Sequence, residues 1–349
     1  MPKTKKPVFD MLAHDRALYR QTPGEYSFHA RTRNSVITWQ KQFRKALRVS
    51  LGLTRMEKDM AGYRPRAQKI DSVDCGFFVR EKWRIWTEPG LPLPFWLLRP
   101  TGPVKRRPLV LTPHGHEPVE HYIGVGQTRK DLKIIRDEQR DVAIQAVMEG
   151  YIAILPTVRG FGETRGLEDA KWENLSSCRS ALMHGLLVGR TPIGERVWDV
   201  ERLIDWAVKR NDVDRSKIAI TGNSGGGTIS LFAAACDTRI SASVPASYFC
   251  TFAGSIGSIW HCDCNYIPGL LRLGEMSDVA GLIAPRPFCA INGSKDDIYP
   301  IEEAKKSFAK LKMIYRVFGA EDNCKLFVGD GGHRYYSDGA WPFVRRAFV

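Results

Sequence analysis

Short apolar runs alternate with longer amphipathic stretches over the last two thirds of the chain. The apolar runs are typical of strands and lie near 108–113, 151–156, 217–221, 242–246, 286–292 and 324–328. The amphipathic stretches predict helices near 134–149, 194–210, 226–236, 276–283, 301–312 and 339–347. Strands that alternate with helices in this way form a mainly parallel sheet with helices on both faces. The pattern therefore predicts an α/β fold.

The first third of the chain follows other patterns. Residues 1 to about 30 are polar and turn-rich, without clear periodicity. A helix is predicted near 36–50, where apolar residues recur at helical spacing with Lys and Arg between them. These apolar residues are Val36, Trp39, Phe43 and Leu47. We expect this helix to dock by its apolar side with its basic side in water, and segments 75–87 and 93–99 indicate an antiparallel strand pair.

These patterns divide the chain into a basic N-terminal helical extension, residues 1–70, and an α/β domain, residues 71–349. One long interruption separates two predicted strands of that domain, at about 248–273, and it is rich in aromatic, Gly and Cys residues. Insertions of this kind usually form a cap or the wall of a pocket. We therefore expect a cap-like insertion there.

Positive charge is concentrated in the N-terminal extension. Residues 1–70 hold 16 of the 52 Lys and Arg residues but only 5 of the 38 Asp and Glu residues, and the formal net charge of the chain is +14. A basic segment can bind nucleic acid, but this one has neither an aromatic stacking motif nor zinc-finger spacing. We interpret it as a solvated face and expect no nucleic-acid partner.

Apolar runs and cysteines bear on the cellular environment. No apolar run approaches the roughly 18 to 20 residues that span a bilayer, and the first residues lack the apolar segment of a signal peptide. We expect a soluble, cytoplasmic protein without a membrane partner. The eight cysteines are scattered rather than spaced as a disulfide framework, which favours reduced thiols. The oligomeric state is not predicted.

A Gly-x-Ser-x-Gly pattern at residues 222–226 carries the strongest chemical signal. An apolar strand runs into this pattern, and a helix-compatible stretch follows it. Glycines at these positions permit a sharp turn that raises the hydroxyl of Ser224 above the sheet, near a helix N-terminus. A phosphate-binding turn is the competing interpretation, but the Lys of a P-loop and the spacing of Gly-x-Gly-x-x-Gly are absent. Ser224 is therefore a candidate nucleophile.

A serine nucleophile needs a base and an acid that orients the base. When the serine occupies such a turn, the acid and then the histidine follow it along the chain. The loop after the predicted strand 286–292 offers Asp296, with Asp297 as an alternative and Asp263 as a more distant one. His333 follows the predicted strand 324–328 in a Gly-rich loop. We choose Asp296 and His333.

Two backbone N–H groups are needed to bind the oxyanion that forms during acyl transfer. Gly225, directly after the candidate nucleophile, supplies one, and His116 in the sequence His114-Gly115-His116 supplies the other. The two histidines could be mistaken for metal ligands, but no carboxylate or third His stands at zinc spacing. Cys262 and Cys264 could hold a metal, form a disulfide or pack, and we favour packing. No metal is predicted.

The assembled motifs resemble those of bacterial α/β-hydrolases grouped with acetyl xylan esterases and dienelactone hydrolase-like proteins. The resemblance covers about residues 75–349, and the helix near 36–50 also resembles one that precedes the domain in that group. It implies the α/β-hydrolase fold, with Ser224, Asp296 and His333 as a catalytic triad. Arg159 lies in an Arg-Gly-x-Gly turn like that of carbohydrate esterases. We favour a structural role for it over substrate contact, because Arg can pin loops through bidentate hydrogen bonds.

These residues predict a serine esterase that forms an acyl-enzyme, acts on small-molecule esters or acetylated carbohydrates and needs no organic cofactor. Tentative pocket residues are the aromatic residues Tyr248, Phe249, Trp260 and Tyr266 of the insertion. A small amidase or peptidase and an acyltransferase remain open on the same fold. A non-catalytic binding protein is disfavoured because all three triad residues are present. The acyl group and the alcohol of the substrate are not predicted.

Overall fold

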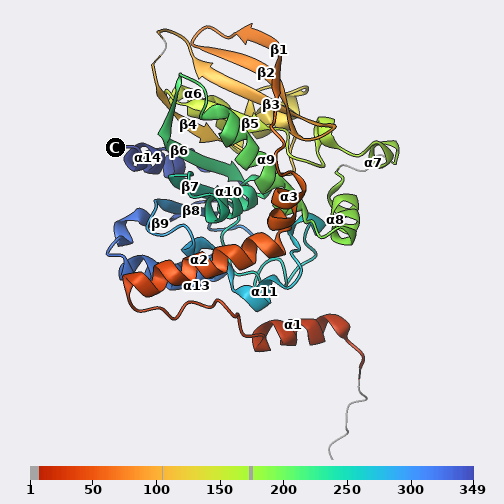
Figure 1. Cartoon of the computed structure of the whole chain (residues 1–349), viewed down its shortest axis with the longest axis vertical. Helices are drawn as coiled ribbons and strands as arrows, with labels where there is room; N and C mark the ends of the chain where they lie inside the picture. Colours follow the sequence, from red (N-terminus) through yellow and green to blue (C-terminus); the bar gives the residue numbers. More distant parts are fainter. Residues whose placement is uncertain (1–7, 104, 173–175) are drawn as a thin grey trace, which may run out of the picture.

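One nine-stranded sheet organises the computed structural model, which describes residues 8–103, 105–172 and 176–349 (Figure 1). Its strands run in the order β1-β2-β3-β5-β4-β6-β7-β8-β9. Their bounds are β1 Ala67–Asp74, β2 Phe78–Glu88, β3 Leu91–Pro100, β4 Arg107–Leu111, β5 Ile152–Pro156, β6 Val213–Asn223, β7 Ala242–Ala246, β8 Phe288–Gly293 and β9 Cys324–Gly329. The pairs from β5 through β9 are parallel, and those from β1 to β5 are antiparallel.

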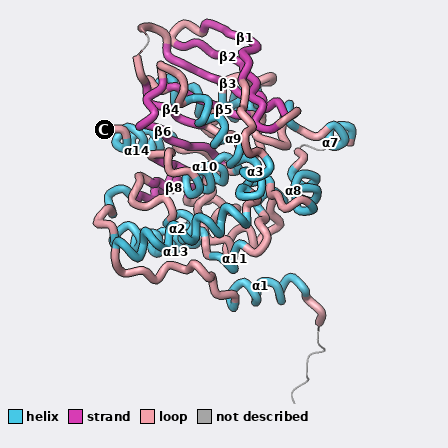
Figure 2. The backbone as a smooth tube through the Cα atoms, viewed as in Figure 1, coloured by secondary structure: helices cyan, strands magenta, loops and turns pink. Residues whose placement is uncertain are grey.

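Helices precede, separate and follow these strands (Figure 2). The N-terminal helices are α1 Met11–Gln21, α2 Arg33–Ser50 and α3 Leu53–Asp59. Those in the first half of the domain are α4 Val119–Tyr122, α5 Arg129–Asp137, α6 Val142–Met148, α7 Leu167–Lys171, α8 Cys178–Leu187 and α9 Pro192–Ala207. The remaining helices are α10 Gly225–Cys236, α11 Leu270–Leu273, α12 Met276–Gly281, α13 Ile301–Val317 and α14 Ser337–Ala347. Short 3-10 turns, η1 Gly162–Thr164, η2 Asp263–Asn265 and η3 Glu321–Asn323, lie between them.

The central strands are apolar along their whole length because both faces of the sheet are covered. In β4, Leu109 and Leu111 enter the core shared with α9, α10 and α12, whereas Val110 enters the core shared with α6 and α14. Successive strand residues point to opposite faces, so a strand buried on both sides reads as a continuous apolar run. The predicted α/β-hydrolase architecture, a mainly parallel sheet between helical layers, is confirmed.

The predicted strands lie within a few residues of those observed, but some elements were missed or merged. Strand β1 was not predicted because it is an edge strand whose residues are almost all exposed, so it shows no apolar alternation. The helix predicted at 134–149 is two helices, α5 and α6, and Gln139 between them has a φ of 55°. Helix α1 lies in the segment predicted to lack regular structure, and none of its residues is buried.

Helix α2 packs on the body of the molecule more intimately than an amphipathic pattern suggests. Phe43 and Leu47 are fully buried in the core that lies under α9 and α10. The expectation that its basic side lies in water is wrong for two residues. Arg44 Nε donates to the carbonyl of Ala235 at 2.8 Å, and Arg48 forms an ion pair with Glu201 at 2.6 Å. Since α2 shares its core with the sheet, it is part of the same folded body.

The division at residue 70 stays a prediction, because it rests on composition rather than on a break in packing. The ribbon of helix α1 lies at the edge of the molecule in Figure 1, but side chains of α1 contact the body. Its Arg16 donates to the carbonyl of Ser258 at 2.9 Å. Within the described ranges, no helix combines the length and the apolar character needed to cross a membrane.

The packing of α2 predicts how much stability this helix contributes. Phe43→Ala should lower the free energy of unfolding by about 3 to 5 kcal/mol, because it removes a fully buried aromatic ring and leaves a cavity. Ile37→Ala in the same helix should change it by less than about 0.5 kcal/mol, because Ile37 is half exposed. Urea denaturation of both variants checks this. Equal and small effects would show that α2 is dispensable for the fold.

Candidate active site

Ser224 occupies a strained turn between a strand and a helix. Strand β6 ends at Asn223, helix α10 begins at Gly225, and Ser224 between them has φ 56° and ψ −116°. Such a conformation costs a residue other than Gly about 1–3 kcal/mol and persists only where the surroundings impose it. The N–H of Ser224 donates to the carbonyl of Ala246 at the end of β7, at 2.9 Å. The turn matches the one predicted from the Gly-x-Ser-x-Gly pattern.

The glycines of this turn are required by the close approach of another segment. A Cβ atom on Gly222 would lie 2.2 Å from the carbonyl oxygen of Pro113, and one on Gly226 would lie 2.0 Å from it. Either side chain would force the loop after β4 away from α10. The glycines therefore set the distance between the serine turn and the loop that carries His114 to His116.

His333 and Asp296 form a hydrogen-bonded pair at the same edge of the sheet as this turn. Asp296 follows β8 and His333 follows β9, so both lie at the same carboxyl edge of the parallel strands as Ser224. His333 Nδ1 lies 2.9 Å from Asp296 Oδ2. Asp296 Oδ1 accepts from the N–H groups of Ile298 and Tyr299 at 3.0 and 3.1 Å. With Nδ1–H donating to a carboxylate, Nε2 of His333 is free to accept a proton.

The geometry favours Asp296 over the two alternatives. The carboxyl group of Asp296 is fully buried, which suits an acid that holds a histidine in one orientation. Asp297 is exposed to solvent, next along the chain. Asp263 lies in η2 and contacts Arg179 at 3.6 Å instead.

Tyr299 and His261 lie beside the His333–Asp296 pair and were not predicted. The ring of Tyr299 stacks on His333 with centroids 5.8 Å apart, and its hydroxyl lies 3.0 Å from His261 Nε2. Burial lowers the pKa of His261 to about 4, so its imidazole is neutral at neutral pH. Nothing in the sequence pairs these two residues, because they lie on different loops.

His114 fixes the shape of the loop after β4. Its Nδ1–H donates to the carbonyl of Gly115 at 2.9 Å, and its Nε2 accepts from the N–H of Val158 at 2.9 Å. Burial lowers the pKa of His114 to about 4, which keeps the ring neutral and so preserves both bonds. Since both ring nitrogens are used, His114 is not a metal ligand.

The predicted oxyanion donors lie side by side. A Cβ atom on Gly225 would lie 3.3 Å from the Cα of Gly115, the residue before His116. Among the described residues, no acceptor takes the N–H of His116. The N–H of Gly225 is in the first turn of α10, where no intrahelical acceptor exists. Both groups are therefore available to an anionic oxygen.

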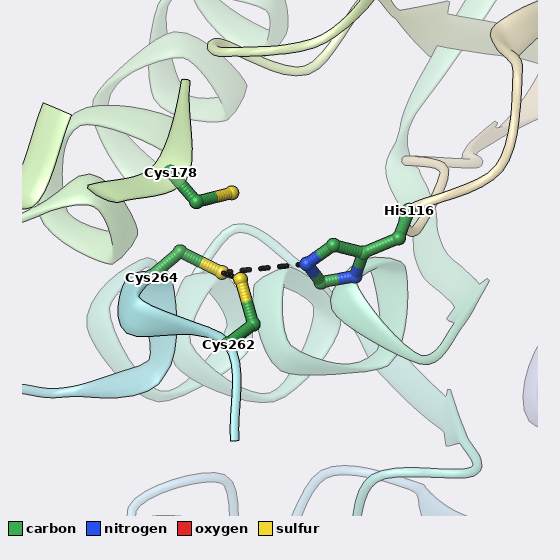
Figure 3. Close-up of side chains that lie close together, drawn as sticks. All are labelled: His116, Cys178, Cys262 and Cys264. Carbon is green, nitrogen blue, oxygen red and sulfur yellow. Dashed lines mark hydrogen bonds between the residues drawn. The ribbon is translucent and has the colours of Figure 1, made fainter. Parts of the chain in front are cut away.

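The side chain of His116 meets three cysteines, as Figure 3 shows. Its ring faces Cys178, Cys262 and Cys264, and the four ligand atoms all lie within 4.8 Å of one another. The interpretation of Cys262 and Cys264 as simple packing residues overlooked Cys178. No spacing rule would have found that residue, because it reaches the cluster from a distant helix.

The predicted pocket residues differ from one another in their surroundings. Tyr248 and Phe249 are fully buried core residues, and their role in a pocket stays a prediction. Trp260 is 99% exposed. Tyr266 lines a cavity of about 320 Å³ with side chains of α1, but neither Ser224 nor His333 lines that cavity. Aromatic composition alone could not distinguish core from surface in this insertion.

Arg159 is held by carboxylates, in line with the structural role predicted for it. It forms ion pairs with Asp199 at 2.7 Å and Glu88 at 2.8 Å. Its carbonyl accepts from Arg196 at 2.9 Å. The guanidinium group of this arginine therefore lies inside the protein, between β2 and α9.

The fold and this site define an α/β-hydrolase. Residues 12–326 match the model of the Abhydrolase family, and the chain belongs to that family. It is 28% identical to the putative hydrolase YtaP of Bacillus subtilis over 190 residues, which are 53% of this chain. The match spans 60% of the length of that relative.

Two solved structures have a similar fold. A putative acetyl xylan esterase from Bacteroides fragilis superposes with a TM-score of 0.75 and 20% identity, covering 96% of this chain and 84% of that one. A glucuronoyl esterase from Teredinibacter turnerae gives a TM-score of 0.61 and 15% identity, covering 82% of this chain and 79% of that one. At such identities the likeness concerns the fold.

Proposed function

We propose that this chain is a serine carboxylic-ester hydrolase in which Ser224 is the nucleophile, His333 the base and Asp296 the acid that orients it. The observation that carries the proposal is the strained turn at Ser224, on the same edge of the sheet as the His333–Asp296 pair. Strain of this kind at a residue other than Gly is typical of functional sites.

In the first half of the reaction, Ser224 Oγ attacks the ester carbonyl while His333 Nε2 takes the hydroxyl proton. The carboxylate of Asp296 stabilises the imidazolium that forms, through the 2.9 Å contact to Nδ1. The N–H groups of Gly225 and His116 bind the oxyanion of the tetrahedral intermediate. The imidazolium then protonates the departing alcohol, and the acyl group remains on Ser224.

In the second half, water attacks the acyl-enzyme while His333 Nε2 takes a proton from it. Collapse of the second tetrahedral intermediate releases the acid, and the proton returns to Ser224. Each of these steps uses groups of this chain. Tyr299, stacked on the ring of His333, helps to keep the imidazole in one orientation throughout.

For the substrate, we propose small esters and acetylated carbohydrates. The names of the similar structures support this class, since one is called an acetyl xylan esterase and another a glucuronoyl esterase. These two names differ in which side of the ester bond carries the sugar. A substrate of the first kind has a sugar as the alcohol, and one of the second kind has a sugar acid as the acyl group.

The pairing of Asp296 with His333 predicts a clear difference between neighbouring carboxylates. Asp296→Asn should lower kcat by about 10⁴-fold, because an amide favours the wrong tautomer of the histidine. Asp297→Asn is the matched control and should keep kcat near that of the unmodified protein, since Asp297 is exposed. Steady-state hydrolysis of p-nitrophenyl acetate measures both. A larger loss of kcat in Asp297→Asn than in Asp296→Asn would show that Asp297 is the acid that orients His333.

The substrate proposal predicts a preference for short acyl groups. Among p-nitrophenyl esters of rising chain length, kcat/KM should be highest for acetate, and acetylated xylo-oligosaccharides should release acetate. Methyl esters of glucuronic acid, assayed in parallel, present the sugar on the acyl side. A higher kcat/KM for those, or for long-chain esters, would contradict the acetyl assignment while leaving the hydrolase chemistry intact.

A further inference from the structure

Three cysteines and one histidine from three separate segments converge beside the oxyanion loop (Figure 3). His116 comes from the loop after β4, and Cys178 is the first residue of α8. Cys262 and Cys264 lie at η2 in the insertion after β7. Cys178 and Cys264 are buried, Cys262 is half-buried and His116 is exposed.

We infer that His116, Cys178, Cys262 and Cys264 form a structural zinc site. Zinc prefers four tetrahedral ligands, and one His with three Cys is among the usual sets. With Zn–S of about 2.3 Å and Zn–N of about 2.0 Å, tetrahedral ligand atoms lie roughly 3.5–3.8 Å apart. Here Cys262 Sγ lies 3.3 Å from Cys264 Sγ, and Cys264 Sγ lies 3.9 Å from His116 Nε2. The spacing of the cluster therefore suits one ion.

Charge in the surroundings also suits a bound metal. Three thiolates, a neutral imidazole and Zn²⁺ carry a net charge of −1, which needs a neighbouring cation. Arg196 is buried and its Nη2 lies 3.5 Å from Cys178 Sγ. Among the described residues, no carboxylate forms an ion pair with Arg196, and its other hydrogen-bond partner is the carbonyl of Arg159. The anionic metal cluster would supply the missing counter-charge.

A polar side chain also hydrogen-bonds to one sulfur atom of the cluster. Asn265 Nδ2 donates to Cys264 Sγ at 3.6 Å, and Asn265 Oδ1 accepts from Thr228 Oγ1 at 3.2 Å. Groups that hydrogen-bond to ligand atoms orient those atoms and are a regular part of metal sites. Cysteines that merely pack behave as small hydrophobic side chains and need no such partners.

The ligand set defines the role of the ion. Four protein ligands leave no open position for water or substrate, so the ion is structural rather than catalytic. It would join the oxyanion loop, the start of α8 and the insertion. One consequence rests on the proposed function: the ion would hold His116 in place, and with it the backbone N–H that binds the oxyanion.

Metal content tests the inference on the full-length protein. Protein produced with zinc chloride and then dialysed should contain about one zinc ion per chain by mass spectrometry of the metal. Replacing zinc by Co²⁺ in the unmodified protein should give the visible bands and the thiolate charge-transfer band of tetrahedral thiolate-bound cobalt. This spectrum depends on no substitution, so it stays informative if a variant fails to fold.

Two cysteine variants provide a matched comparison. Cys262→Ser should weaken zinc binding by more than about tenfold. Even the loss of a group that only hydrogen-bonds to a ligand typically lowers metal affinity by that much. Cys75→Ser should keep the full zinc content, because Cys75 is also half-buried but lies in the turn between β1 and β2, outside the cluster. Circular dichroism of both variants checks that they fold.

Three results would overturn the inference. The first is a zinc content far below one per chain, together with free reaction of the three cluster thiols with a thiol reagent. The second is a disulfide within the cluster in the mass spectrum of the non-reduced protein. The third is an equimolar content of a metal other than zinc. Ester hydrolysis is a separate readout. A protein that binds zinc but hydrolyses no ester would refute the proposed function and leave the metal site standing.

Discussion

The contact between the Pro113 carbonyl and the glycines of the serine turn is the constraint on which the site depends. Because Gly222 and Gly226 have no side chains, the loop after β4 lies directly against the start of α10. The close approach also places the loop that carries His116 next to Gly225. Without it, the proposed nucleophile and the two proposed oxyanion donors would not lie together. The buried sheet supplies the rigidity that maintains the strain.

A chain of hydrogen bonds, interrupted by one ring stack, links the proposed catalytic pair with the sulfur cluster. It runs from Asp296 to His333, through the stacked ring of Tyr299 to His261, and from there to Asn265, whose Nδ2 lies 3.2 Å from His261 Nδ1. Asn265 also contacts Cys264 and Thr228. An ion in the cluster would therefore stiffen both the loop that carries His116 and the contacts behind His333, the proposed base.

Much of this site could be predicted from the sequence because it follows the ends of apolar strands. Ser224 comes directly after such a strand, Asp296 and His333 lie in the loops that follow two others, and parallel strands bring their carboxyl ends to one edge. The cluster could not be predicted, because Cys178 belongs to a helix whose place beside the insertion depends on tertiary packing. The burial of the candidate pocket residues could not be predicted either, because it also depends on tertiary packing. Tyr248 and Phe249 are aromatic like Trp260, yet they are buried while Trp260 is exposed.

Ser224 is proposed to be an activated nucleophile, and covalent labelling measures that activation directly. The folded protein, treated with a fluorophosphonate and digested, should carry one adduct on the peptide that contains Ser224. The adduct should be absent from Ser224→Ala and from protein unfolded before treatment, since activation depends on His333 and the turn. A folded protein that remains unlabelled, or an adduct that persists in Ser224→Ala, would contradict the account.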